Sequence, residues 1–528
     1  MKRHSLSIVV IICISIGIYA NTLRNGFVFD DEGTIVENSM IKNFGNLQKL
    51  FQADYFSRSG EMSYRPIVTF SYFLDYAAFG LKPWGYHLTN IILHVVNGVL
   101  LYTFLTLLFQ PSAANWQPSD IKEMLYSRSF LISLLFATHS VLTEAVNAIS
   151  FREDLLVFLF YISTLSLYLL LKRNSAQSLT TYLLYSISCF FYFLGLLSKE
   201  MAATLPLVVF CYEWLYADKE KGRMRSILFN HYNIGYMAVT LIYLYIRFYH
   251  FQNPIVIFTP HWPLMTRLFT VSWLLLNYIK FSAFPVSLVA DYRISPVTSP
   301  LSFVIPLIAA SILLIILRLG RKEAIFGALF FFVTLTPVYN LIPISNPFAE
   351  RYLYLPMAGF LIAMAFAIRA EFNKIQKVSI LMLILTIITF NSLSVIRRNS
   401  VWMDNESLWS DTVRKMPNSS LAHLNLGIVY FRQGKFEIAE SEYRLSSGLN
   451  PEDPRPYNNL AVIYDMKGQL DEAVLQFYNA LRLSPGNPKY HYGLANVFYK
   501  QKRFDEAKEE YSIALKQNPN PVERHHIN

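Results

Sequence analysis

Hydrophobic residues gather in long runs along the first 400 residues of the chain. Each run has about 17 to 25 residues, which is the length that a helix needs to cross the apolar part of a bilayer. We therefore predict eleven membrane helices. A further apolar run at 266–290 contains Lys280 and Pro285, and we expect it to be re-entrant or interfacial. The eleven expected helices are 5–21, 86–109, 128–148, 153–171, 180–198, 201–217, 232–250, 300–318, 323–341, 352–369 and 378–397.

Beyond residue 400 the chain becomes polar and repeats itself with a fixed period. Prolines recur every 34 residues at Pro417, Pro451, Pro485 and Pro519. Small and aromatic residues keep the same register: Gly427, Ala461 and Ala495; Ala439, Ala473 and Ala507; Tyr443, Phe477 and Tyr511. This pattern resembles the tetratricopeptide repeat and predicts three helix–turn–helix units at 420–453, 454–487 and 488–521 within residues 402–528. Stacked units of this kind share a core and leave a groove for a peptide or protein, although they could also serve only to stiffen the C-terminus.

The composition supports a polytopic membrane protein with an all-α fold. Hydrophobic residues make up 53% and charged residues 16% of the chain, and the mean hydropathy is +0.32, whereas soluble proteins carry about 25% charged residues. We expect a membrane helical domain at 1–400, followed by an α-solenoid. The net charge of +10 comes largely from short basic loops that the positive-inside rule explains, so no nucleic-acid partner is expected. The three cysteines lie in apolar runs and indicate no disulfide framework.

The basic loops also predict which side of the membrane each segment faces. If the N-terminal "MKRH" is cytoplasmic and the first helix is uncleaved, residues 22–85 form the first extracytoplasmic loop. The basic loops 172–179 and 218–231 then lie inside, and the repeats lie outside. A fully spanning 266–290 would instead move the repeats to the cytoplasm. The low cysteine count favours a bacterial inner membrane with periplasmic repeats, or the ER membrane if the protein is eukaryotic.

Ionisable residues at membrane depth are costly and are therefore functional candidates. Three consecutive acids, Asp30, Asp31 and Glu32, follow the first helix, and an N-cap for a following helix is the alternative reading of them. Short turns on the same predicted outer face contribute further candidates, which could also be charges that only anchor helix ends. Arg152 with Asp154 is expected to line the site or to form a structural ion pair. The further candidates are Arg65, His87, His139, Glu144, Arg152, Asp154, Lys199, Glu200, Glu350 and Arg351.

These residue types suit chemistry on a lipid-linked sugar phosphate. A carboxylate can act as general base toward a hydroxyl, while arginine and lysine can hold a phosphate. A polyprenyl-phosphate sugar has an apolar tail, an interfacial phosphate and a sugar beyond it, although transport of an anionic solute fits these charges nearly as well. We expect no cofactor other than this donor substrate. No metal site is expected, because His139 and Glu144 are five residues apart, which is not the spacing of a helical zinc pair.

Several stretches occur in the order found in one family of membrane enzymes. They are "GFVFDDEGTI", "YRPIVTFSYFLDYAAFGLKPWGYHLTNIILHVVN", "HSVLTEAVNAISFREDLL", "LLSKEMAATLP" and "AERYLYLP", and the repeats follow them. Together they resemble the transmembrane and tetratricopeptide-repeat O-mannosyltransferases, which belong to the GT-C class of lipid-dependent glycosyltransferases.

The resemblance implies transfer of a sugar, with mannose expected, from a polyprenyl phosphate to a Ser or Thr hydroxyl of a protein held by the repeats. It also implies that the acidic pair of the first outer loop is essential. That pair falls on Asp30 and Asp31, and Asp31 is slightly favoured as the base because Glu32 completes an Asp-Glu pair. The alternatives are glycosylation of an envelope glycan or lipid, and a membrane-anchored scaffold without catalytic activity.

Overall fold

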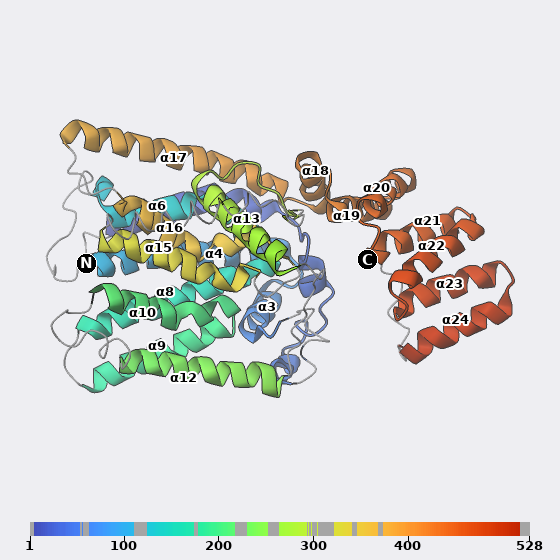
Figure 1. Cartoon of the computed structure of the whole chain (residues 1–528), viewed down its shortest axis with the longest axis horizontal. Helices are drawn as coiled ribbons and strands as arrows, with labels where there is room; N and C mark the ends of the chain where they lie inside the picture. Colours follow the sequence, from blue (N-terminus) through green and yellow to red (C-terminus); the bar gives the residue numbers. More distant parts are fainter. Residues whose placement is uncertain are drawn as a thin grey trace. The chain divides into compact units, whose positions relative to one another are not determined.

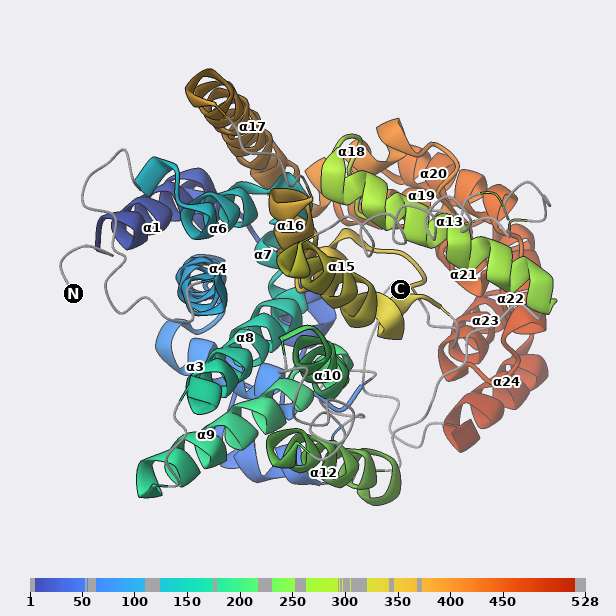
Figure 2. The same ribbon diagram turned by 60° about the vertical axis from the view of Figure 1, so that its left-hand side comes forward.

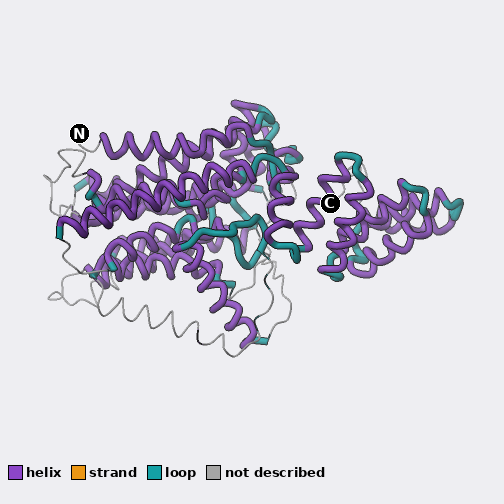
Figure 3. Tube along the Cα trace, turned by 90° about the horizontal axis from the view of Figure 1, so that it is seen from above, coloured by secondary structure: helices purple, strands orange, loops and turns teal. Residues whose placement is uncertain are grey.

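The computed structural model describes most of the chain as helices and turns, and the described residues contain no strand (Figures 1 and 3). The all-α fold class is confirmed. Two compact units form: Met1–Leu288 with Ile294–Met403, and Asp404–Asn528 with Val289–Arg293. The described residues are 5–52, 55, 63–109, 124–173, 178–216, 230–251, 263–292, 294, 297, 304, 321–340, 346–367 and 373–517.

Within these ranges, the first unit contains five helical segments that are long and apolar enough to cross a membrane. They are α1 (Ser5–Tyr19) with the turn η1 (Ala20–Arg24), α4 (Pro83–Phe109), α8 (Arg152–Arg173) with η5 (Ile149–Phe151), α9 (Leu179–Leu196) and α17 (Lys374–Val401). Each coincides with an expected membrane helix, and together they indicate a multi-pass membrane protein. Helix α8 is the most buried of the five and packs against α4 and α9 (Figures 1 and 2).

The remaining expected membrane segments are shorter helices or lie outside the described residues. Residues 300–318 are outside the described ranges, apart from one isolated residue. The 20-residue helix α13, which covers most of 266–290, is not among the five membrane candidates. The count of eleven spans stays a prediction. The other helices in the apolar runs are α10 (Leu205–Tyr216), α12 (His231–Tyr245) with η7 (Ile246–His250), α13 (Leu264–Ala283), α15 (Lys322–Leu335) with η9 (Thr336–Val338), and α16 (Pro356–Phe366).

The segment expected to be one helix at 128–148 is broken near its middle. Helix α6 (Arg128–Thr138) ends at His139, and η4 (Ser140–Leu142) and α7 (Thr143–Asn147) continue at an angle of 48°. The His139 side chain supports the break, because its Nδ1 accepts a hydrogen bond from the N–H of Val141 at 3.4 Å. If the bent pair is one span, the described residues contain six candidate spans.

Two glycines allow α15 and α16 to approach each other closely. A Cβ atom on Gly359 would lie 2.6 Å from the backbone nitrogen of Phe331 and 2.7 Å from the carbonyl oxygen of Gly327. A Cβ on Gly327 would lie 2.4 Å from the nitrogen of Ala363. Small residues at such contacts are typical of membrane helices, whose association depends on close van der Waals packing and interhelical hydrogen bonds.

Hydrogen bonds between helices add to this packing. His94 in α4 contacts the hydroxyl of Tyr354 at 2.8 Å and the carbonyl of Ala137 at 3.0 Å. Asn97, one turn further along α4, donates to the carbonyl of Leu155 at 2.9 Å. Buried polar side chains of this kind fix the relative positions of helices, because moving any one of them would leave a polar group unsatisfied.

The loop after α1 is tied to the ends of two other helices. The amide of Asn25 donates to the carbonyl of Asn399 in α17 at 2.9 Å. The Gly26 N–H donates to the carbonyl of Met403 at 2.8 Å, and the carbonyl of Gly26 contacts Nε2 of His87 at 3.2 Å. The loop therefore begins from a fixed position. Its short helices are η2 (Glu32–Val36), η3 (Phe44–Phe51) and α3 (Pro66–Phe79).

The second unit has the three predicted helix pairs, preceded by α18 (Asn405–Lys415). Side chains of Ser419, Asp453 and Asn487 accept hydrogen bonds at the start of the first helix of each pair, which gives all three pairs the same N-terminal boundary. Gly427 allows the two helices of the first pair to pack closely, since a Cβ there would lie 2.5 Å from the Tyr443 ring. The pairs are α19 (Ser420–Arg432) with α20 (Phe436–Leu449), α21 (Pro454–Met466) with α22 (Leu470–Leu483), and α23 (Pro488–Lys500) with α24 (Phe504–Gln517).

Candidate active site

Asp31 is a buried carboxylate that holds the first loop against the start of α8. Its Oδ1 accepts a hydrogen bond from the Ser150 N–H at 2.7 Å, and its Oδ2 accepts one from the Val28 N–H at 3.1 Å. Burial raises the pKa of Asp31 to about 6, against the lowering effect of these hydrogen bonds. The capping alternative is wrong for Asp31, because it precedes η2 but its side chain makes no cap hydrogen bond there.

Asp30, the preceding residue, faces water. Within the described ranges its carboxylate accepts no hydrogen bond, while its backbone carbonyl accepts from Thr34. The protein around Asp30 still desolvates the carboxyl group enough to raise its pKa; nearby Arg351 lowers this pKa and nearby Glu153 raises it. Asp30 therefore has the accessibility that a proton acceptor needs, whereas both oxygens of Asp31 are occupied.

The backbone reverses direction at Phe29, directly before the acids. Phe29 has a φ of 57°, a left-handed conformation that is uncommon outside glycine. Its ring packs edge-on against Phe151 with 5.7 Å between centroids. The guanidinium of Arg351 lies 3.8 Å above the same Phe151 ring. The turn at the start of α8 thus supports the acidic loop on one side and a cation on the other.

Arg152 is a structural cross-link, and its expected pairing with Asp154 is wrong. Its guanidinium contacts Oδ2 of Asp75 at 2.6 Å, Oδ1 of Asn90 at 2.7 Å and the hydroxyl of Ser71 at 3.0 Å, and the side chain is fully buried. In a helix, residues two positions apart point to nearly opposite sides, which separates Arg152 from Asp154. Asp75 was missed, although a lone acid within an apolar run signals a buried partner.

Lys199 and Glu200 are adjacent, yet they contact different partners. Nζ of Lys199 lies 2.6 Å from Oδ2 of Asp154 and 3.7 Å from Oε1 of Glu153. Oε2 of Glu200, at the start of η6 (Glu200–Thr204), lies 3.1 Å from Nη2 of Arg65. Arg65 also contacts Oε1 of Glu153 at 3.0 Å, so the three segments are joined by one chain of ion pairs.

Glu350 and Arg351, in η10 (Glu350–Leu353), also diverge. Arg351 forms an ion pair with Glu144, and its N–H donates to Oε2 of the same carboxylate at 2.8 Å. Both oxygens of Glu350 lie 2.8 Å from Nη2 of Arg398 in α17, so Glu350 is engaged away from Arg351. Arg398 was missed, because it lies beside Arg397 near the end of a membrane run and looks like an interfacial charge.

The two histidines of the candidate set both hold backbone segments. His87 contacts the carbonyl of Gly26, and Nε2 of His139 contacts the carbonyl of Ser282 at 3.1 Å. His139 and Glu144, which were considered together, therefore have different partners. Glu32 begins η2 and is only partly exposed.

The structure thus brings most of the predicted charges to one end of the membrane unit. Direct ion pairs or electrostatic effects on Asp30 connect them, and we call this set the acid–base cluster. Arg247, at the end of α12, joins it through a 2.8 Å contact with Glu200 and was missed by the sequence analysis. The catalytic or binding role of each residue stays a prediction. The acid–base cluster consists of Asp30, Arg65, Glu144, Glu153, Asp154, Lys199, Glu200, Arg247 and Arg351.

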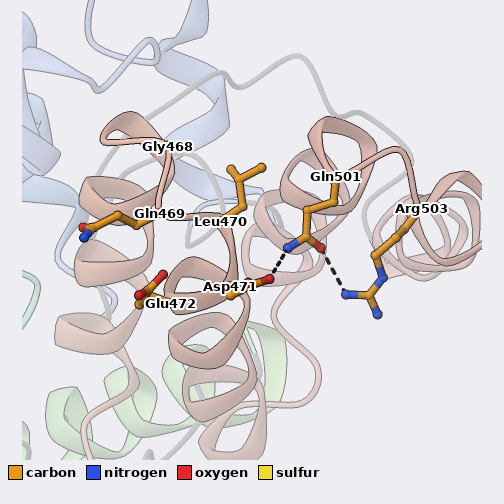
Figure 4. A pocket seen from close by; sticks show the side chains of 7 residues that line it. All are labelled: Gly468, Gln469, Leu470, Asp471, Glu472, Gln501 and Arg503. Carbon is orange, nitrogen blue, oxygen red and sulfur yellow. Dashed lines mark hydrogen bonds between the residues drawn. The ribbon is translucent and has the colours of Figure 1, made fainter.

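A separate polar hollow occurs in the repeat unit, between two of its turns (Figure 4). Gln501 joins its sides, because it donates to Asp471 at 2.7 Å and accepts from Arg503 at 3.0 Å. These side chains are paired with one another, and none of the predicted site residues lies here. The hollow is lined by Gly468, Gln469, Leu470, Asp471, Glu472, Gln501 and Arg503.

Comparisons with known proteins agree with both units. Tetratricopeptide-repeat family models match residues 414–488 and 466–526. The protein O-mannosyl-transferase F38B6.6 of Caenorhabditis elegans is 28% identical over 84% of this chain and 63% of its own length. The human protein O-mannosyl-transferase TMTC3 is 26% identical over 82% of this chain and 50% of its own length.

The chain therefore spans between half and two thirds of the length of these relatives. The similarity covers the membrane unit as well as the repeats, since the repeats alone make up less than a third of the chain. The chain thus has tetratricopeptide repeats in its C-terminal unit and is similar, over most of its length, to proteins named protein O-mannosyl-transferases.

Proposed function

We propose that the chain is a membrane glycosyltransferase that moves a sugar, with mannose expected, from a polyprenyl phosphate to a protein hydroxyl on the non-cytoplasmic face. The observation that carries the proposal is the division between Asp30 and Asp31. Asp30, a member of the acid–base cluster, faces water, while the carboxylate of Asp31 is buried and fixes the loop. The similarity to proteins named protein O-mannosyl-transferases supports the reaction class.

In this reaction Asp30 is the base. Its carboxylate takes the proton of a Ser or Thr hydroxyl as the hydroxyl oxygen bonds to the anomeric carbon of the sugar. The bond between that carbon and the phosphate oxygen breaks, and the lipid phosphate leaves with the bonding electrons. The products are the glycosylated protein and the free lipid phosphate, and the anomeric configuration is inverted. Asp31 is a positioning residue, because its two hydrogen bonds hold the backbone next to Asp30.

The repeat unit supplies the acceptor. Helix pairs of this kind usually bind peptides or proteins along their stacked faces. Binding the acceptor protein raises the local concentration of its hydroxyls near the membrane unit. A bacterial inner membrane with periplasmic repeats, or an ER membrane with luminal repeats, provides the required face.

Transfer assays on point variants test the proposal. The purified chain in lipid vesicles receives radiolabelled polyprenyl-phosphate mannose and a cell-envelope extract as acceptor. We expect Asp30→Asn to lower kcat by about 10²- to 10⁴-fold with little change in the donor KM, the usual range for loss of a general base. Glu37→Gln, which removes an exposed acid of the same loop, is the matched control and should leave transfer unchanged.

Each alternative has a distinct outcome. Full activity of Asp30→Asn would remove Asp30 from the chemistry. Absence of transfer from any lipid-linked sugar would favour a scaffold. Transfer that survives deletion of residues 402–528 would indicate a glycan or lipid acceptor, because only a protein acceptor requires the repeats.

A further inference from the structure

Glu200 lies between two guanidinium groups at the edge of the acid–base cluster. Its Oε2 is 3.1 Å from Nη2 of Arg65, and its Oε1 is 2.8 Å from Nη1 of Arg247. The second arginine comes from η7, so two cations that are far apart in the chain converge on one carboxylate. Burial raises the pKa of Glu200, but the two arginines outweigh it and hold this pKa well below its usual value, so the carboxylate is ionised.

Glu200 differs from the other ion-paired carboxylates of the acid–base cluster because solvent reaches its side chain. Its side chain is 30% exposed, and the side chains of Arg65 and Arg247 are 20% and 11% exposed. Asp154, Glu144 and Glu350, which pair with Lys199, Arg351 and Arg398, are at most 1% exposed, and Glu153, the second carboxylate near Lys199, is 6% exposed. A fully buried ion pair cannot release one partner without leaving an uncompensated charge, whereas a solvent-exposed carboxylate can move into water. The Arg65–Glu200–Arg247 group is therefore the one in which another anion can replace the carboxylate.

Helix α12 brings an apolar surface up to this group. The helix packs against α9 and α10 (Figures 1 and 2). The rest of its surface exposes large hydrophobic residues along its length. Arg247 turns inward from the same segment, where its Nη1 also donates to the hydroxyl of buried Tyr243 at 2.7 Å. The exposed large hydrophobic residues along α12 and η7 are Ile234, Met237, Leu241, Ile242, Leu244, Tyr245, Phe248 and Tyr249.

We propose that Arg65 and Arg247 bind the phosphate of a lipid whose apolar chain lies along α12, and that Glu200 occupies the position of the phosphate while the lipid is absent. The two guanidinium groups can bind two phosphate oxygens as they now bind two carboxylate oxygens. The phosphodiester of a lipid-linked sugar carries one negative charge, so replacing Glu200 leaves the charge at the two arginines unchanged. This inference rests on the proposed function in that the lipid is the sugar donor, and it assigns the donor phosphate to specific residues.

Direct binding of a phosphorylated lipid tests the assignment without any transfer reaction. The full chain, purified in maltoside micelles free of phospholipid, is titrated with radiolabelled polyprenyl monophosphate. We expect Arg247→Gln to weaken binding at least about tenfold, because a lost hydrogen bond to a charged group costs that much or more. Arg24→Gln is the matched control, since Arg24 is an exposed arginine at the end of the first helix and should bind as wild type.

Glu200→Gln separates this assignment from a purely structural role. If Glu200 competes with the phosphate, removing its charge should tighten binding several-fold. If Glu200 only holds the two arginine side chains in position, the same change should weaken binding, and that result would overturn the proposal. Unchanged binding by Arg247→Gln would also overturn it. Arg247→Lys should retain part of the affinity, and it provides a second measurement if Arg247→Gln does not fold.

Competition experiments distinguish the source of the phosphate. Unlabelled polyprenyl monophosphate should displace the label far better than inorganic phosphate or neutral polyprenol. Equal displacement by polyprenol would mean that only the apolar part of the lipid is recognised. Equal displacement by inorganic phosphate would contradict a lipid site. Asp30→Asn should bind the lipid as wild type. Normal lipid binding by the wild-type chain, with no transfer from any lipid-linked sugar, would remove the proposed function but keep this site. If transfer depends on Asp30 but Arg247→Gln binds the lipid as wild type, the proposed function would stand and this phosphate site would be removed.

Discussion

The carboxylate of Asp31 accepts a hydrogen bond from the backbone N–H of Ser150, with 2.7 Å between Oδ1 and the nitrogen. The two residues are 119 positions apart in the chain. This bond fixes the acidic loop to the start of α8. The first turn of α8 also carries Glu153 and Asp154, which form ion pairs within the acid–base cluster. Two adjacent acids in the sequence thus have different environments, and only the first is open to a substrate.

Loss of Asp31 should therefore reduce stability, whereas loss of Asp30 should not. Asp31→Ala leaves two buried N–H groups without an acceptor, and we expect the free energy of unfolding to fall by about 1–3 kcal/mol. Asp30→Ala is the matched control and should change it by no more than about 0.5 kcal/mol, as for other exposed positions. Thermal unfolding in detergent micelles measures both. Equal destabilisation by the two changes would contradict the division of roles.

The transfer rate should fall in acid because Asp30 must be ionised to accept a proton. Its pKa is raised above the ordinary value of 3.8, so the acid limb of the kcat/KM profile should lie above that pH, with about a tenfold fall per pH unit below it. Glu153→Gln should move the limb to lower pH, since Glu153 raises this pKa. Residual activity of Asp30→Asn should show no such limb. An identical limb in that variant would assign it to another group.

Arg152 should act on stability rather than on catalysis. Removing it leaves the Asp75 carboxylate buried without its cation, and breaking a buried pair in this way costs about 3–5 kcal/mol. Arg152→Met should therefore strongly lower the unfolding temperature, and the double change Arg152→Met with Asp75→Leu should recover much of the loss. Donor KM and kcat of folded double-variant protein should be near wild type. A catalytic defect in a stably folded double variant would place Arg152 in the active site.

The contact between α15 and α16 should tolerate no side chain at Gly359. A methyl group there meets backbone atoms of Phe331 and Gly327, which cannot move aside as a side chain can. We expect Gly359→Ala to lower the free energy of unfolding by about 1–3 kcal/mol, the usual cost of overpacking. Gly17→Ala in α1 is the control, because nothing lies within 4 Å of its added Cβ. A neutral effect of Gly359→Ala would mean that the helices separate easily.

The repeat unit should lose stability as the pH rises above the ordinary histidine pKa of 6.5. The hydrogen bond from His423 to Glu442, at 2.6 Å, raises the pKa of His423 above its ordinary value of 6.5, while burial lowers it. A raised histidine pKa stabilises the folded state fully below the unfolded pKa, and this stabilisation is lost as the pH rises through the folded pKa. Unfolding of the repeats followed at several pH values should show this loss, and Glu442→Gln should weaken it.

A second copy of this arrangement occurs two repeats later. His491 contacts Glu510 at 2.5 Å and the carbonyl of Pro485 at 2.9 Å, as His423 contacts Glu442 and Pro417. Both ring nitrogens face acceptors in each case. Absence of any pH dependence in the unfolding of the repeats would show that protonation of His423 does not contribute to their stability.

The sequence by itself determined the elements whose signal is local or periodic. The 34-residue period of prolines and small residues predicted all three helix pairs, because each pair repeats the same packing with its neighbour. The long apolar runs predicted α1, α4, α8, α9 and α17, because a membrane helix must satisfy its own backbone and hide it in apolar side chains. The cost of charge at membrane depth also singled out most members of the acid–base cluster.

Only the tertiary structure decided which charge meets which. Arg152 pairs with Asp75 and Asp154 with Lys199, although sequence proximity paired Arg152 with Asp154. Likewise, the sequence does not distinguish Asp30 from Asp31. Asp31 accepts one hydrogen bond from nearby Val28, but its second comes from Ser150, far along the chain. Ion pairs depend on which helix ends meet in space, and a sequence read alone contains no distances between its helices.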